Sequence, residues 1–137
     1  MADDPARIDS SRAWFVRAAE DIYCASLDLS GSPPPVRDAL FHCEQAVEKA
    51  LKGFLTWHDR PFRKNHDLVD LGKRCVRVDA ELEPLLRRVG AFTEYASRFR
   101  YPGDLFDPTQ AEAEGALVLT REVVDAILSR LPDPVRP

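Results

Sequence analysis

No apolar run in this sequence approaches the roughly 20 residues that a membrane-spanning helix needs. The first residues, MADDPARIDSS, have no basic start followed by an apolar stretch, so we expect no secretory signal. The three cysteines, Cys24, Cys43 and Cys75, form no C-x-x-C pair, and each sits in an apolar pattern. We interpret them as free, buried thiols in a reducing compartment. These absences predict a cytoplasmic protein without a membrane-spanning segment.

Signatures of metal and cofactor sites are also missing. The three histidines, His42, His58 and His66, include no pair at the i, i+4 spacing, and no H-E-x-x-H motif occurs. The six glycines are scattered, so the sequence has neither a Walker nor a Rossmann phosphate loop, and there is no G-x-S-x-G. We therefore expect no metal and no cofactor, and no set of catalytic residues is self-evident.

The composition is that of one globular domain covering residues 1–137. The chain is 45% hydrophobic and 31% charged, with a formal net charge of −4, so a general attraction to nucleic acid is not expected. The cations are unevenly distributed, which leaves room for a local basic patch. Six of them lie in one stretch: Arg60, Arg63, Lys64, Lys73, Arg74 and Arg77.

Apolar residues recur at three- to four-residue intervals in five segments, as they do in amphipathic helices. The segments cover roughly residues 11–29, 35–57, 66–78, 84–99 and 108–131. We expect Asp9, Ser10 or Ser11 to cap the first helix, Asn65 the third and Asp107 the fifth. No segment alternates with a period of two. The sequence therefore predicts an all-α, up-and-down bundle of about five helices, four long and one short.

The second segment has two adjacent apolar stripes, which predict a central helix with several neighbours. The stripe of small residues consists of Ala39, Cys43, Ala46, Ala50 and Gly53. The stripe of large residues consists of Leu40, Val47, Leu51 and Phe54. The small stripe should let another helix approach closely.

Charged residues also share this segment. Glu44 and Glu48 are one helical turn apart, with Lys49 and Lys52 nearby. One interpretation is a solvated helix face carrying ion pairs. The other is a polar groove that positions a ligand, and the spacing is compatible with both.

The densest constellation of charge lies at the start of the third segment. It contains Arg60, Arg63, Lys64 and His66. Helix N-termini favour anions, histidine can move a proton near neutral pH, and arginine can hold a phosphate through two hydrogen bonds. These residues would suit the phosphates of RNA or of a nucleotide. Alternatively, His66 helps to cap the helix and the arginines are solvated loop residues.

Another constellation interleaves cations and aromatic residues at Arg98, Phe99, Arg100 and Tyr101. This is the composition of a surface on which nucleic-acid bases stack. Alternatively, Phe99 belongs to the core and Tyr101 covers one end of the bundle. Pro102 disfavours helical geometry at Tyr101, so the chain must turn there.

Three motifs together resemble the HEPN family (higher eukaryotes and prokaryotes nucleotide-binding). They are F-H-x-x-Q-A-x-E-K-A-L-K at residues 41–52, H-D-L at residues 66–68, and Tyr95 followed by R-Y-P at residues 100–102. The resemblance runs from near Trp14 to the fifth segment and requires no insertion. It implies a five-helix bundle, usually dimeric, that often pairs with a small nucleotidyltransferase as a toxin–antitoxin module.

Many members of that family are metal-independent RNases with an R-x4-6-H motif whose arginine and histidine meet across the dimer. The histidine is thought to take the proton of the ribose 2′-OH, while the arginine stabilises charge on the phosphate. Arg60 and His66 have this spacing, and Arg63 is close by. The family motif, however, lies near the end of the long penultimate helix, and the matching residues 98–104 hold no histidine here.

The resemblance therefore implies a homodimeric module that binds a nucleotide, RNA or a partner nucleotidyltransferase. The alternatives are a metal-independent RNase and a purely structural dimer. We expect the large stripe of the second segment, or the fifth segment, to form the dimer interface. The candidate ligand-binding residues are Glu44, Glu48, Lys49, Lys52, His66, Arg100 and Tyr101.

Overall fold

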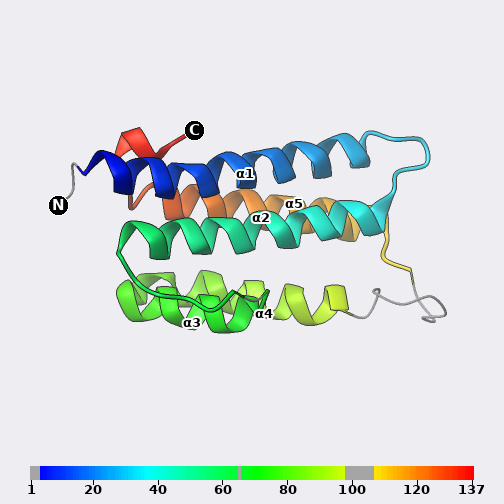
Figure 1. Ribbon diagram of the computed structural model, residues 1–137. Coiled ribbons are helices and arrows are strands. Elements are labelled where there is room, and N and C mark those ends of the chain that lie inside the picture. Colours follow the sequence, from blue (N-terminus) through cyan, green and yellow to red (C-terminus); the bar gives the residue numbers. More distant parts are fainter. Residues whose placement is uncertain (1–3, 65, 98–106) are drawn as a thin grey trace.

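The computed structural model describes residues 4–64, 66–97 and 107–137. Within these residues the chain forms five α-helices and no strand, which confirms the predicted all-α bundle. The helices are α1 (Pro5–Leu29), α2 (Val36–Trp57), α3 (Leu68–Val78), α4 (Glu83–Ser97) and α5 (Gln110–Leu128), and two short 3-10 segments are η1 (Ala80–Leu82) and η2 (Asp133–Val135). Figure 1 shows α1 and α2 as an antiparallel pair backed by α5, with α3 and α4 along the other side of α2.

The first helix begins earlier than predicted. Asp4 is its N-cap and accepts a hydrogen bond from the backbone of Ala6 at 3.0 Å. The predicted caps at residues 9–11 are wrong, because Ser11 lies inside the helix and is fully buried. Its hydroxyl donates to the carbonyl oxygen of Gly53 at 2.8 Å. The serine therefore joins α1 to α2 instead of starting α1.

Two other helix starts also differ from the predictions. Asp67 caps α3 by accepting from two backbone N–H groups, whereas Asn65 lies outside the described residues. Thr109 caps α5 in a capping box with Glu112, in which each side chain accepts from the other residue's backbone. The predicted cap Asp107 is wrong, since its carboxylate pairs with Arg37 near the start of α2. Reciprocal bonds make Thr109 the better helix start.

The central position of α2 is confirmed, because both of its apolar stripes are buried. The small stripe allows the predicted close approach: a Cβ placed on Gly53 would lie 2.6 Å from the ring of Phe15 on α1. The large stripe packs inside the chain's own core, between 0% and 3% exposed. The expectation that it forms the dimer interface is therefore wrong, and α5 remains the predicted contact.

All three cysteines are free, as expected. Cys43 and Cys75 are buried, and burial raises the pKa of the Cys43 thiol to about 11 and that of Cys75 to about 12. Cys24 is only half-buried, which corrects the expectation for that residue. Among the described residues, none of the helices combines the length and apolar character needed to cross a bilayer.

Candidate functional site

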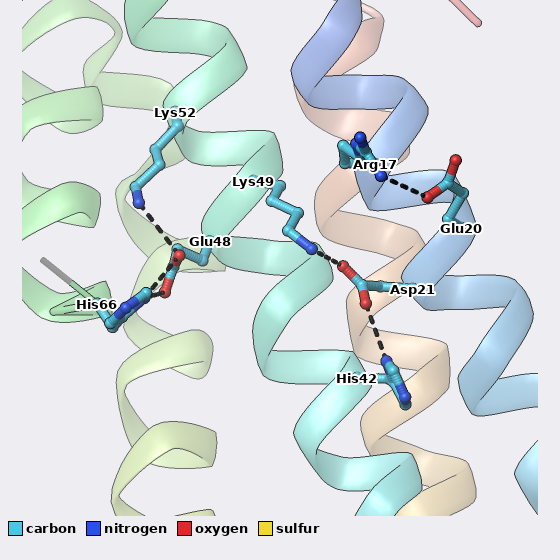
Figure 2. A network of polar contacts seen from close by, with 8 residues as sticks. All are labelled: Arg17, Glu20, Asp21, His42, Glu48, Lys49, Lys52 and His66. Atoms are coloured by element: carbon cyan, nitrogen blue, oxygen red, sulfur yellow. Dashed lines mark hydrogen bonds and ion pairs between the residues drawn. The ribbon is translucent and has the colours of Figure 1, made fainter. Parts of the chain in front are cut away.

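A buried ionic network connects α2 to the loop before α3. Glu48 is 4% exposed and Lys52, one turn later, is 6% exposed. The Lys52 ammonium donates to Glu48 Oε2 at 3.1 Å, and His66 Nδ1 lies 2.8 Å and 2.9 Å from the two oxygens of the same carboxylate (Figure 2). The interpretation of a solvated face is therefore wrong for Glu48 and Lys52, although their i, i+4 pairing was visible in the sequence.

Aromatic rings enclose the ammonium group of this network. Lys52 Nζ lies 5.4 Å from the ring centroid of Trp14 on α1 and 5.8 Å from that of Phe62 in the loop after α2. The two rings meet edge to face with their centroids 6.2 Å apart. A cation over aromatic faces is stabilised by their quadrupoles. Lys52 is thus held between the carboxylate and the rings, away from solvent.

His66 is the exposed member of the network. Its side chain is 78% exposed, although Nδ1 is held by the buried carboxylate of Glu48. Since an ionised carboxylate only accepts hydrogen bonds, this contact assigns the proton to Nδ1 and makes Nε2 the acceptor of the ring. A neutral imidazole in this tautomer can accept a proton at Nε2. Glu48 therefore fixes the orientation of a largely exposed imidazole whose Nε2 can accept a hydrogen bond or a proton.

The other predicted site residues divide into three groups. Arg60, Arg63 and Lys64 are exposed in the loop that leads to His66. Glu44 is half-buried on α2, one turn before Glu48. The remaining candidates, Arg100 and Tyr101, lie outside the described residues, as do Arg98 and Phe99. The structure therefore brings Glu48, Lys52 and His66 together, with three cations in the adjoining loop.

Lys49 belongs to a different network, which sequence reasoning missed. Its ammonium pairs with Asp21 of α1, and the same carboxylate lies 2.9 Å from His42 Nδ1 (Figure 2). Asp21 is 7% exposed. The sequence could have indicated that Asp21 is buried. It is three residues after Ala18 and four before Ala25, on the stripe that α1 buries. A carboxylate at such a position needs polar partners on a neighbouring helix.

This second network extends to the end of α1. His42 Nε2 lies 3.4 Å from Asp38 Oδ2, one turn earlier on α2. Asp38 also neighbours Asp28 in the last turns of α1. Burial raises the pKa of Asp28 to about 6, helped by the hydrogen bond and charge of Asp38.

Comparison with known protein families gives one match. A model of the HEPN domain matches residues 11–131, a stretch that includes residues from all five helices and both polar networks. No curated protein and no solved structure matches the chain in the corresponding comparisons. The matched stretch covers most of the 137 residues, and its all-α architecture agrees with the family. The chain belongs to the HEPN domain family.

Proposed function

We propose that this protein binds the phosphate groups of a nucleotide or of RNA at the loop between α2 and α3. The observation that carries the proposal is the contact between a buried carboxylate, Glu48, and a largely exposed imidazole, His66. His66 contacts the ligand through Nε2, which accepts a hydrogen bond from a ribose hydroxyl beside the phosphate. Arg60 and Arg63, exposed in the same loop, supply positive charge for the phosphate.

The energetics of the network support a positioning role. Taking two charges out of water costs free energy, and their mutual attraction often does no more than offset that cost. Apolar side chains of similar volume would therefore serve the fold of α2 as well as Glu48 and Lys52 do. Apolar side chains could not replace Glu48 in one respect, because its carboxylate is a fixed hydrogen-bond acceptor for His66 Nδ1. Lys52 pairs with Glu48 inside the bundle and does not itself face the ligand.

Calorimetry of the full chain with ATP, and separately with a short single-stranded RNA, tests this proposal. We expect at least one probe to bind, and we expect His66→Ala to weaken that binding about tenfold through loss of the hydrogen bond that Nε2 accepts. Arg12→Ala, which removes an exposed cation on α1, is the control and should bind like the wild type. Absence of binding by both probes, or equal affinity of the wild type and His66→Ala, would contradict the proposal.

The family also supports a proposal about assembly. We propose that the chain forms a homodimer and pairs with a minimal nucleotidyltransferase in a toxin–antitoxin-type system, acting in the cytoplasm. With the large stripe of α2 buried, the outward face of α5, where Val118 is 57% exposed, is the expected contact between copies. Light scattering at micromolar concentration checks the dimer, because a particle of 15.5 kDa is a monomer.

A second candidate is a metal-independent RNase, and the same contact favours it. With Nδ1 held by Glu48, His66 Nε2 can take the proton of a ribose 2′-OH, while Arg60 or Arg63 stabilises the phosphate. Incubation of RNA with the purified protein in EDTA, beside His66→Ala, tests it. Cleavage by the wild type alone supports the RNase, whereas equal cleavage by both proteins, or by neither, rules it out.

A further inference from the structure

We propose that Asp28, Asp38 and His42 bind a divalent transition-metal ion, Zn²⁺ being the best fit, between the end of α1 and the start of α2. This site lies apart from Glu48 and His66 and does not depend on the proposed function. The proposal goes against the expectation from the sequence that the protein has no metal site. A search of the sequence for two histidines one helical turn apart could not find this site. Two of its three ligands are carboxylates, and Asp28 comes from a different helix than the other two.

The spacing of the donor atoms suits a metal. Each of the three residues offers one ligand atom, and these atoms all lie within 4.8 Å of one another. Asp38 and His42 are one turn apart on α2, and Asp28 faces them from α1. Ligand atoms around a tetrahedral Zn²⁺ ion, with bonds of about 2.0–2.2 Å, are roughly 3.3–3.6 Å apart. Side-chain rotations that move the donors by about 1 Å would therefore close the site.

The histidine is already oriented as a metal ligand. Its Nδ1 donates to Asp21 Oδ1 at 2.9 Å, and Lys49 holds the other oxygen of Asp21. Nε2 is thereby left to face the carboxylates, 3.4 Å from Asp38 Oδ2. Metal-binding histidines characteristically donate their second N–H group to a carboxylate, which fixes the tautomer and the ring orientation. Asp21 lies outside the set of ligands, so this support is independent of the cluster itself.

Asp28 supplies a second observation in support of the metal site, besides the contact of His42 with Asp21. Its Oδ2 atom is buried and has no donor among the described residues, because Asp38 can share a hydrogen bond with Asp28 only while one of the two carboxyl groups carries a proton. A buried carboxylate oxygen without a donor is costly, and a cation between Asp28 and Asp38 would satisfy it. The mixed set of one imidazole and two carboxylates suits Zn²⁺ better than Mg²⁺ or Ca²⁺, which prefer oxygen ligands alone. Three protein ligands leave a fourth position for water or for a group from a partner.

Metal titration of the full chain tests the site. After treatment with EDTA and dialysis, ZnCl₂ is titrated into the protein by calorimetry, and Co²⁺ is added to a second sample to record its visible absorption bands. We expect one ion per chain and the absorption bands of tetrahedral Co²⁺. Asp38→Ala and His42→Ala should each weaken zinc binding at least about tenfold, and Asp21→Asn about tenfold through loss of orientation.

His58→Ala is the matched control, because it removes a half-buried histidine at the C-cap of α2, far along the helix from Asp38 and His42, and should leave zinc affinity unchanged. Circular dichroism establishes that each variant is folded, and Asp28→Asn provides a further ligand variant of nearly unchanged shape. Absence of zinc binding by the wild type, or the same affinity in folded His42→Ala and Asp38→Ala, overturns the proposal. ATP or RNA binding by the EDTA-treated protein is a separate readout, so the two proposals fail independently.

Discussion

Lys52→Ala should lower the free energy of unfolding by about 3–5 kcal/mol, the range for removing one partner of a buried ion pair. The variant leaves Glu48, 4% exposed, without the ammonium group that lies 3.1 Å away. His66 remains a partner of the carboxylate, so we expect the loss toward the lower end of this range. Urea denaturation followed by circular dichroism measures the difference, with the slope of the transition showing whether unfolding remains two-state.

The control for this prediction is another ion pair with the same spacing. Glu83 and Arg87 on α4 are also at i, i+4, with a contact of 2.7 Å, but their side chains are 43% and 76% exposed. Arg87→Ala should therefore cost no more than about 0.5 kcal/mol. The double variant Glu48→Leu/Lys52→Met should lose far less than Lys52→Ala, because it leaves no uncompensated charge. Equal losses in Lys52→Ala and Arg87→Ala would show that burial of the first pair has no energetic consequence.

Gly53→Ala should destabilise the protein by about 1–3 kcal/mol, although alanine is the better helix former by about 1 kcal/mol. A Cβ on Gly53 would lie 2.6 Å and 2.9 Å from two ring carbons of Phe15. Phe15 is 1% exposed, so its ring cannot move aside without displacing other core residues. The bond from Ser11 to the Gly53 carbonyl holds the two helices together at this same point. Thermal and urea denaturation measure the effect.

Gly115→Ala on α5 is the matched control for Gly53→Ala, which tests the close contact of α1 and α2. Beyond its chain neighbours and the adjoining backbone of α5, a Cβ at Gly115 meets no atom of the described residues within 4 Å, so the substitution should stabilise the protein by about 0.5–1 kcal/mol. The two glycine substitutions are thus expected to have opposite signs. The same sign at both positions would contradict the close packing of α1 on α2.

Much of the fold could be predicted because helical periodicity is a local signal. The stripes on α2 identified a central helix, and their spacing placed Gly53 at a close contact before any neighbour was known. Helix starts were less predictable. Ser11 resembles a cap in sequence, but its hydroxyl instead bonds to another helix, and only the packing of α1 on α2 distinguishes the two roles. At α5, Thr109 and Glu112 carry the capping-box pattern, and the N-cap is Thr109 instead of Asp107, two residues earlier.

The site was less accessible to prediction, because burial depends on distant residues. The i, i+4 spacing of Glu48 and Lys52 occurs equally on solvated helices. What makes this pair different is Trp14 from α1 and Phe62 from the loop, which enclose Lys52 in the folded chain. The burial of Asp21 could have been predicted from its place on the apolar stripe of α1, and a buried carboxylate requires a polar partner. Its connection to His42 and Lys49 required the three-dimensional arrangement.

The central claim is that buried Glu48 holds His66 through Nδ1 and leaves Nε2 for the ligand. Nitrogen-15 NMR of the histidine rings at alkaline pH, where imidazole is neutral, reports which nitrogen carries the proton. We predict that His66 is protonated at Nδ1 in the wild type and that Glu48→Ala returns it to the Nε2-protonated form preferred by a free imidazole. A wild-type His66 ring protonated at Nε2 would contradict the account.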